Sequence, residues 1–202
     1  MKKHCLKAFF VVAISVLLIS CAGQQVQTTA PTFTPYTFQA NQYVPKVDNF
    51  VVISDTSSSM ADKYNGTSKA EISQKFLMAM NQTLPEFKYN GALRTFGHSA
   101  YLPDRSTMSV YDVQSYSTAG FGSALKDVKG PSGDSSLPLA KAIAAAGKDL
   151  KSTRGPIAVI IVSDGADMDQ APVKAAKDLK GEFGNRLCID TVQVGNDPGG
   201  KT

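Results

Sequence analysis

One short loop carries the residues of this chain that are best suited to chemistry. Asp55 is followed at alternate positions by Ser57 and Ser59. A carboxylate with regularly spaced hydroxyls offers only oxygen donors, which are the ligands that hard cations prefer. Mg²⁺ in particular binds six oxygens near octahedral geometry and keeps some of its waters. The loop is therefore a candidate magnesium site, although Asp and Ser are also common in turns and helix N-caps.

Two apolar runs are expected to position this loop. Residues 50–53, Phe-Val-Val-Ile, lead into Asp55, and residues 157–163 lead directly into Asp164. Runs rich in β-branched residues indicate strands that are covered on both faces of a parallel sheet. In an open α/β sheet, ligands bind just beyond the carboxyl ends of the strands. We therefore expect the Asp55 loop and Asp164 to converge on one crevice.

Residues 55–60, Asp-Thr-Ser-Ser-Ser-Met, resemble the first loop of the metal-ion-dependent adhesion site of von Willebrand factor A (vWA) domains. The strand that runs into Asp164 and a following glycine resembles a later loop of the same site. The resemblance implies that Ser57 and Ser59 bind Mg²⁺ directly, or Mn²⁺ or Ca²⁺ in its place. It also implies that Asp55 and Asp164 hold the waters of the metal. The remaining coordination position would take a carboxylate from a partner protein.

A third loop of the family supplies a Thr or Ser ligand, normally two residues before the Leu that opens the apolar face of the next helix. In this chain that Leu is Leu139, and the ligand position is occupied by Leu137. Ser136 takes the role of third ligand if the loop adjusts by one residue, and Ser135 is the alternative. The resemblance leaves the choice between these two serines open.

The resemblance and the order of apolar patterns predict an α/β fold: a Rossmann-like, doubly wound, mostly parallel sheet flanked by helices. Helices are expected over 68–84, 116–128, 139–151 and 170–183, and further strands over 89–96, 108–113 and 187–194. The strand over 108–113 is expected at a sheet edge. Domains of the family add another strand and a closing helix, so we expect this last strand and helix to be missing from the 202 residues.

The first twenty residues are typical of a targeting segment. Lysines precede an apolar stretch, residues 8–19, which is too short to span a membrane comfortably. Leu18-Ile19-Ser20-Cys21 resembles a bacterial lipobox, which implies removal of a lipoprotein signal peptide, residues 1–20, and lipidation of Cys21. A plain secretory peptide or an uncleaved signal anchor is the alternative. The residue directly after Cys21 is Ala22 and not an acidic residue, which favours the outer membrane of a bacterial cell envelope, facing the periplasm.

Residues 21–45 are rich in Gln, Thr, Ala and Pro. Such a composition buries too little apolar surface to fold alone, so it predicts a flexible tether between lipid and domain. Its aromatic residues leave open that part of the segment packs on the domain as an extra strand: Phe33, Tyr36, Phe38 and Tyr43. The vWA domain itself is expected over 46–202.

Charge and cysteine content narrow the function further. The formal net charge is +4, and removal of Lys2, Lys3 and Lys7 with the signal peptide lowers it from +4 to +1. A charge so close to zero gives no support for nucleic-acid binding. With Cys21 lipidated, Cys188 has no partner for an intramolecular disulfide. Its strand-like surroundings predict a small buried hydrophobe.

The vWA and lipobox resemblances together imply a binding module and not an enzyme: a lipid-anchored domain that captures an acidic side chain of a protein ligand through its metal. A structural envelope protein with a vestigial site is the first alternative, favoured by the departure at Leu137. A Mg²⁺-dependent hydrolase is the weaker one. Ser57 stands where haloacid-dehalogenase enzymes need a second Asp. Residues 133–137 resemble the nucleophile block of GDSL-type esterases, but these enzymes need a histidine base further along the chain and none follows His98. His98 itself is expected in a solvated loop. By analogy, a peptidoglycan-binding, OmpA-like domain is expected beyond Thr202.

Overall fold

The computed structural model describes residues 33–38, 42–98, 106–131, 139–166 and 169–201. Residues from Pro35 onward form one compact unit. Its main elements are β1 (Asn49–Asp55), α2 (Lys69–Thr83), β4 (Asn90–Phe96), β5 (Thr107–Ser115), α3 (Thr118–Asp127), α4 (Leu139–Leu150), β6 (Ile157–Ser163), α5 (Ala171–Phe183) and β7 (Leu187–Gln193). Shorter elements are the 3-10 helices η1 (Ser58–Ala61), η3 (Gly184–Arg186) and η4 (Pro198–Lys201), and the strands β2 (Lys63–Tyr64) and β3 (Thr67–Ser68). The order of the main elements confirms the prediction.

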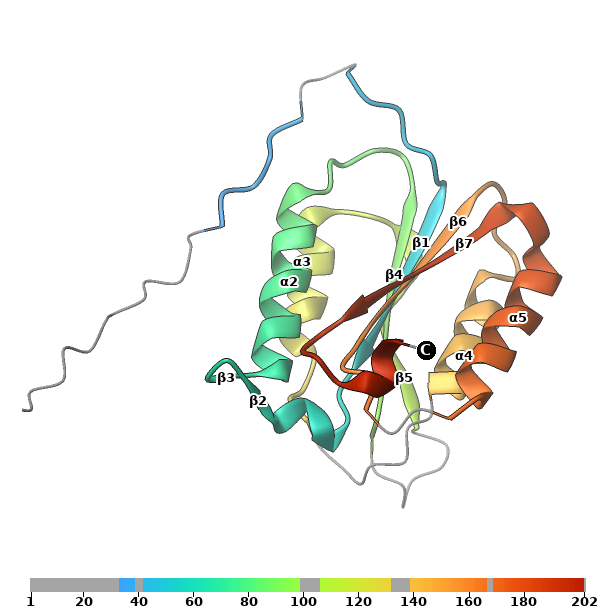
Figure 1. The fold of residues 1–202 in the computed structure, drawn as a ribbon. Helices are drawn as coiled ribbons and strands as arrows, with labels where there is room; N and C mark the ends of the chain where they lie inside the picture. Colours follow the sequence, from blue (N-terminus) through green and yellow to red (C-terminus); the bar gives the residue numbers. More distant parts are fainter. Residues whose placement is uncertain (1–32, 39–41, 99–105, 132–138, 167–168, 202) are drawn as a thin grey trace, which may run out of the picture. The chain divides into compact units, whose positions relative to one another are not determined.

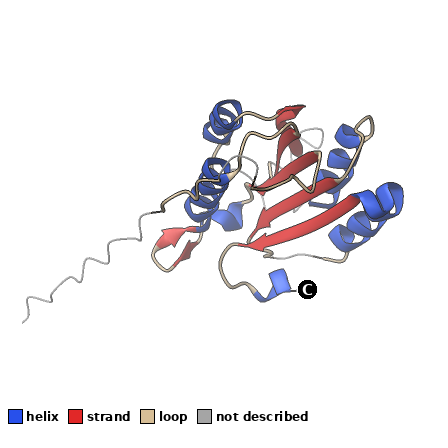
Figure 2. Ribbon diagram, turned by 90° about the horizontal axis from the view of Figure 1, so that it is seen from above, coloured by secondary structure: helices blue, strands red, loops and turns tan. Residues whose placement is uncertain are grey.

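A five-stranded sheet with the order β5-β4-β1-β6-β7 forms the centre of this unit. β1 pairs in parallel with β4 on one side and with β6 on the other, and β6 pairs in parallel with β7. The edge strand β5 is antiparallel to β4. Helices α2 and α3 cover one face of the sheet, and α4 and α5 cover the other (Figures 1 and 2). The predicted doubly wound, mostly parallel architecture is confirmed, and its topological switch point lies at β1.

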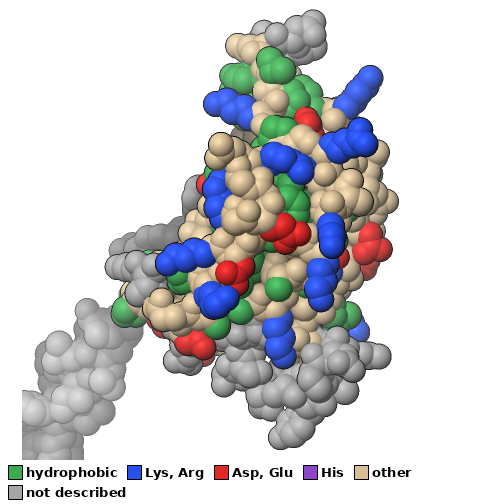
Figure 3. Space-filling model, turned by 90° about the vertical axis from the view of Figure 1, so that its right-hand side faces the viewer, with side chains coloured by type: hydrophobic (Ala, Val, Ile, Leu, Met, Phe, Trp, Pro, Cys, Tyr) green, Lys and Arg blue, Asp and Glu red, His purple; other side chains and the backbone are tan. Residues whose placement is uncertain are grey.

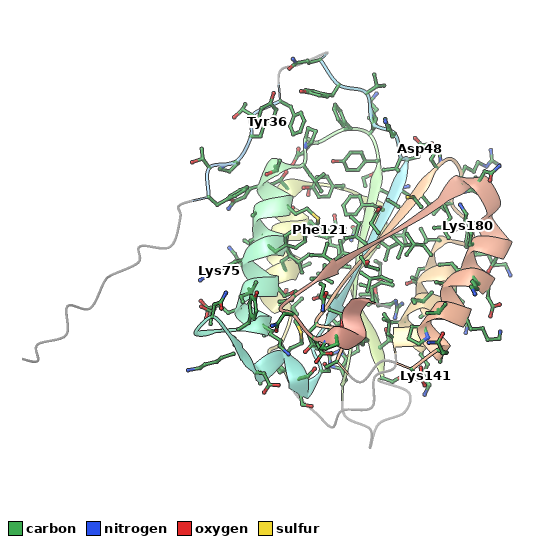
Figure 4. All side chains as sticks on the ribbon, viewed as in Figure 1. Tyr36, Asp48, Lys75, Phe121, Lys141 and Lys180 are labelled. Atoms are coloured by element: carbon green, nitrogen blue, oxygen red, sulfur yellow. The ribbon has the colours of Figure 1, made fainter. Side chains whose placement is uncertain are left out.

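The side chains of β1 alternate between two apolar cores, one on each face of the sheet. Val51 and Ile53 pack with residues of α4 and α5, whereas Phe50 and Val52 pack with residues of α2 and α3. All seven residues of β1 are buried, as expected for a strand covered on both faces. Phe121 of α3 is fully buried in the second core, between its helix and the sheet (Figure 4). This packing holds the carboxyl end of β1 in place.

A tight hairpin, β2–β3, separates the end of β1 from α2. Asn65 and Gly66 at its tip have φ angles of 50° and 84°, the pair of positive values that a type I′ turn requires. Ser68 then caps α2, because its Oγ accepts a hydrogen bond of 3.2 Å from the backbone N–H of Glu71. The hairpin was not predicted, although Asn-Gly is a strong hairpin signal. As a result, α2 begins at Lys69 and not directly after the Asp55 loop.

Two expectations about single residues were wrong. Cys188 is exposed and not buried, because its neighbours Leu187 and Ile189 face the α4–α5 core and strand residues alternate in direction. His98 is partly buried, and its Nε2 lies 2.8 Å from Thr95 Oγ1. Burial lowers the pKa of His98. Neither residue therefore has the environment that its local sequence suggested.

The segment before the domain contains no helix or strand in its described parts, residues 33–38 and 42–48. Aromatic rings there contact one another: the ring centroids of Tyr36 and Phe38 are 4.9 Å apart, and those of Phe38 and Tyr43 are 4.9 Å apart. These described residues add no strand to the sheet.

The outer side of α4 and α5 is solvated, as predicted for α5. Lysine, arginine and acidic side chains are interspersed over this face (Figure 3). The exposed pair Lys174–Asp178 has an N–O distance of 2.6 Å, and Lys141 is exposed on α4 (Figure 4). Of the helices within the described residues, none has the length and apolar character needed to cross a membrane.

Candidate metal centre

Asp55 lies at the carboxyl end of β1 with both carboxylate oxygens engaged. Oδ1 accepts a hydrogen bond of 2.8 Å from the backbone N–H of Ser57, which closes an Asx turn. Oδ2 accepts a hydrogen bond of 2.5 Å from the hydroxyl of Ser163, the last residue of β6. Asp55 is 2% exposed. The neighbouring strand thus fixes the carboxylate in one orientation.

The hydroxyls of Ser57 and Ser59 lie side by side, with Oγ atoms 3.1 Å apart. Two oxygen ligands at adjacent octahedral positions around Mg²⁺, each about 2.1 Å from the metal, are about 3.0 Å apart. The pair therefore has the spacing of two direct ligands before any metal binds. Ser58, between them in the sequence, is exposed. The residues present fit the metal that the sequence predicted.

Asp164 follows β6 and is completely buried. Its Oδ1 accepts a hydrogen bond of 3.0 Å from the backbone N–H of Ala166, and its Oδ2 accepts one of 2.8 Å from Nζ of Lys69. The Lys69 side chain is 11% exposed. Sequence reasoning did not find Lys69, because the residue is 95 positions from Asp164 and reaches it only through the hairpin that delays the start of α2.

Ser163 was also missed as a site residue, since it reads as the end of a buried strand. Its Oγ donates to Asp55 and accepts a hydrogen bond of 3.1 Å from the backbone N–H of Gly165. Ser163 therefore joins the β1 loop to the β6 loop. No local sequence signal distinguishes it, because its role depends on the pairing of the two strands.

The electrostatics of the two carboxylates differ. Burial raises the pKa of Asp55, hydrogen bonds from Ser163 and Ser57 partly offset this rise, and the charge of Asp164 adds to it. For Lys69, burial acts to lower the pKa, but the hydrogen bond and charge of Asp164, with Asp62 and Asp197 nearby, outweigh it and raise the pKa. Burial thus disfavours the charged form of Asp55, whereas Asp164 favours the charged form of Lys69.

The turn after β4 contacts the loop that follows Asp55 and helps to position it. The Phe96 carbonyl accepts hydrogen bonds from the backbone N–H and the Oγ1 of Thr56, at 2.9 and 2.7 Å. Gly97 follows with φ of +92°, and a Cβ added there would lie 2.4 Å from the backbone nitrogen of Ser57. Only glycine fits this contact, so β4 also sets the position of the loop.

A cavity of about 310 Å³ lies beside Asp55, between α2 and residues 128–131. Ser73 lines it with Asp55 and Thr56. In the described part of the chain, the buried Oγ of Ser73 has no hydrogen-bond partner. The cavity therefore offers polar groups next to the candidate metal loop.

The structure places Asp55, Ser57, Ser59 and Asp164 at the carboxyl ends of the adjacent strands β1 and β6. The candidate third ligands Ser135 and Ser136, and the candidate lipidation site Cys21, lie outside the described residues. Among the residues that the structure does describe, no three His, Cys, Asp or Glu side chains come close enough to hold a metal by themselves. A metal here would depend on hydroxyls.

Solved structures with the same arrangement identify the fold. An aerotolerance-related membrane protein from Bacteroides fragilis matches with a TM-score of 0.56 and 14% identity, over 72% of this chain and 67% of that one. A von Willebrand factor type A structure from Catenulispora acidiphila matches with a TM-score of 0.51 and 16% identity, over 71% of this chain and 32% of that one. The fold is that of a vWA domain. Manganese-loaded TRAP protein from Plasmodium vivax also shares it, with a TM-score of 0.53 and 17% identity over 75% of this chain and 59% of that one.

A curated relative extends the likeness to sequence. The uncharacterized protein YwmD from Bacillus subtilis is 30% identical, over 59% of this chain and 55% of that protein. The chain with the vWA fold thus spans about half the length of this relative. No family model matches the sequence. These likenesses concern the fold, and the function has to be argued from the site.

Proposed function

We propose that this chain is a protein-binding module that captures an acidic group of its partner through a divalent metal, Mg²⁺ or Mn²⁺, at the carboxyl ends of β1 and β6. The observation that carries the proposal is the 3.1 Å spacing of the Ser57 and Ser59 hydroxyls next to the anchored carboxylate of Asp55. Manganese-loaded TRAP supports it, since a protein of the same fold holds a divalent metal.

The residues divide the work as follows. Ser57 and Ser59 supply direct oxygen ligands, and Ser136 or Ser135 supplies a third. Asp55 and Asp164 orient metal-bound waters, because each carboxylate oxygen keeps a lone pair besides the hydrogen bond that it accepts. When bound, the metal supplies an electrophilic position that an incoming carboxylate can fill.

Binding is favoured over catalysis by the partners of the two carboxylates. The hydrogen bonds described for Asp55 and Asp164 come from serines, backbone amides and Lys69, with no histidine or cysteine among them. A hydrolase would need an activated nucleophile or a base within reach of the substrate. The Lys69–Asp164 ion pair favours the second candidate, a structural envelope protein in which the metal site is vestigial.

Metal binding should be visible as thermal stabilisation. A ligand at a hundredfold excess over its dissociation constant stabilises the folded state by about 2.7 kcal/mol, which for a domain of this size corresponds to roughly 5–10 °C in Tm. We expect millimolar Mg²⁺ to raise the Tm of the EDTA-treated wild type by this amount, and Ser57→Ala to remove most of the shift. Differential scanning calorimetry with and without Mg²⁺ measures it.

Ser58→Ala is the matched control, since Ser58 is exposed and lies between the two ligand positions. It should keep the Mg²⁺ shift of the wild type. A wild type that is indifferent to Mg²⁺ and Mn²⁺ would favour the structural alternative. Equal losses in Ser57→Ala and Ser58→Ala would show that the loop is assigned wrongly.

The proposal includes an envelope location. Processing before Cys21 and acylation of its sulfur would anchor the module through lipid, at the outer membrane facing the periplasm, with peptidoglycan contact through a further domain. In bacteria fed radiolabelled palmitate, we expect label in the wild-type chain and none in Cys21→Ser. Label in both variants, or in neither, would contradict the lipoprotein assignment.

A further inference from the structure

Lys69 occupies an electrostatically unusual position. It is the first residue of α2, where the helix dipole favours acidic side chains and disfavours lysine. Its ammonium group nevertheless turns into the site and lies 2.8 Å from Oδ2 of the fully buried Asp164. A buried carboxylate without a compensating charge is costly. Lys69 therefore supplies the compensating charge for Asp164 in the metal-free protein.

The stem of Lys69 is held in this orientation by the structure around it. Its backbone N–H donates a hydrogen bond of 2.9 Å to the Asp62 carbonyl. The aliphatic carbons of Lys69 run close to Gly195, which follows β7, since a Cβ added at Gly195 would lie 3.5 Å from Cε of Lys69. The pair is thus a built feature of the fold and not a chance contact between two mobile surface side chains.

We infer that Lys69 is an internal cation that competes with the divalent metal for Asp164 and sets the metal affinity of the site. This inference rests on the metal site proposed above. In the metal-free protein, Asp55, Asp164 and Lys69 together carry a formal charge of about −1 in place of −2, because Lys69 cancels one carboxylate. A divalent ion entering beside Lys69 meets both a weaker negative field and a positive neighbour. The site therefore binds metal more weakly, and releases it more readily, than two free carboxylates would.

The test is a pair of charge-removing variants on the same helix. Lys69→Met removes the ammonium and keeps a stem of similar length. Lys75→Met is the matched control, because Lys75 pairs with Glu71 on the exposed side of α2 and points away from the domain (Figure 4). Isothermal titration of Mg²⁺ and Mn²⁺ into EDTA-treated and dialysed protein measures the affinity, and calorimetry measures the Tm.

Lys69→Met should bind Mg²⁺ at least about tenfold more tightly than the wild type, a change of about 1.4 kcal/mol, while Lys75→Met should be unchanged. Without metal, Lys69→Met should melt at a lower temperature than the wild type, because Asp164 loses its compensating charge. With saturating Mg²⁺ this difference should shrink or reverse. If Lys69→Met does not fold without metal, Lys69→Gln keeps a donor for Asp164, lacks the charge, and should show the same gain in affinity.

The outcomes separate this inference from the proposed function. Equal or weaker Mg²⁺ binding in the Lys69 variants, with a responsive wild type, overturns the role of Lys69 and leaves the metal site standing. If Lys69→Met binds Mg²⁺ or Mn²⁺ and the wild type does not, the competition by Lys69 is supported, and metal-dependent capture by the natural protein is overturned. If neither protein binds Mg²⁺ or Mn²⁺, both proposals are wrong.

Discussion

Asp55→Asn is expected to abolish the Mg²⁺ response while making the metal-free protein more stable at neutral pH. Asn has the same shape as Asp, and its Oδ1 can still accept the hydrogen bond from the Ser57 N–H. Its Nδ2 can donate to Ser163 Oγ, which has the capacity to accept two hydrogen bonds. The fold of the loop is therefore kept, but the negative charge that draws in a divalent cation is lost.

The sign of the stability change follows from the pKa of Asp55, which is raised mainly by burial. A carboxyl group with a raised pKa stabilises the fold through its protonated form. This contribution is complete below the pKa of an unfolded Asp, about 3.9, and is lost as the pH rises through the higher pKa of the folded state. The wild type loses this contribution as Asp55 ionises, whereas Asn is neutral at every pH.

We therefore expect the metal-free Asp55→Asn variant to melt roughly 2–4 °C above the wild type at pH 7, equivalent to about 1 kcal/mol. The difference should narrow as the pH falls toward 4. Asp190→Asn is the control, because Asp190 is exposed on β7. This substitution should change neither the dependence of Tm on pH nor the Mg²⁺ shift. A full Mg²⁺ shift in Asp55→Asn would show that Asp55 does not take part in metal binding.

Gly97→Ala is expected to damage stability and metal binding together. The φ angle of +92° at Gly97 disfavours any residue with a Cβ, and that Cβ would lie 2.4, 2.7 and 2.9 Å from the N, Cα and Cβ atoms of Ser57. Two of these atoms belong to the backbone, so the loop itself has to move. We expect a loss of about 2–4 kcal/mol in the free energy of unfolding, and a Mg²⁺ shift reduced to a small fraction of that of the wild type.

Gly66→Ala separates the effect of the positive φ angle from the effect of the contact between the added Cβ and Ser57. Gly66 also has a positive φ, +84°, but nothing lies within 4 Å of an added Cβ. This variant should lose about 1–2 kcal/mol from the backbone conformation alone and keep its full Mg²⁺ shift. Urea unfolding gives the free energies, and calorimetry gives the shifts. If Gly97→Ala behaves like Gly66→Ala in both measurements, the turn after β4 does not position Ser57.

The fold was predictable because its patterns are local and consistent. Burial of every residue of β1 requires an apolar run, and the run at residues 50–53 shows it. The ends of α2 follow from Ser68 as N-cap and from Pro85, which cannot continue a helix. Errors arose where burial depends on neighbours from other elements. Cys188 lies in an apolar stretch, yet it faces the side of β7 that is exposed at that position.

The site was predictable only in part. The spacing of Asp55, Ser57 and Ser59, and the position of Asp164 after a strand, are sequence properties, and the parallel pairing of β1 with β6 places them at one edge. The roles of Lys69, Ser163 and Gly97 are properties of the tertiary structure. Each of them acts on a residue that is 40 or more positions away, such as Asp55 for Ser163, so no local window contains both members of the pair.

The sequence by itself determined the order of the main strands and helices, the two faces of the central strand and the identity of the oxygen donors, because side-chain alternation, capping and ligand chemistry act over a few residues. Only the tertiary structure decided what charge those donors experience. Sheet pairing brings Ser163 to Asp55, and a hairpin of a few residues shifts the start of α2 so that the ammonium of Lys69 meets Asp164. In our proposal the metal affinity of the loop depends on that long-range contact, since electrostatic interactions act through space and not along the chain.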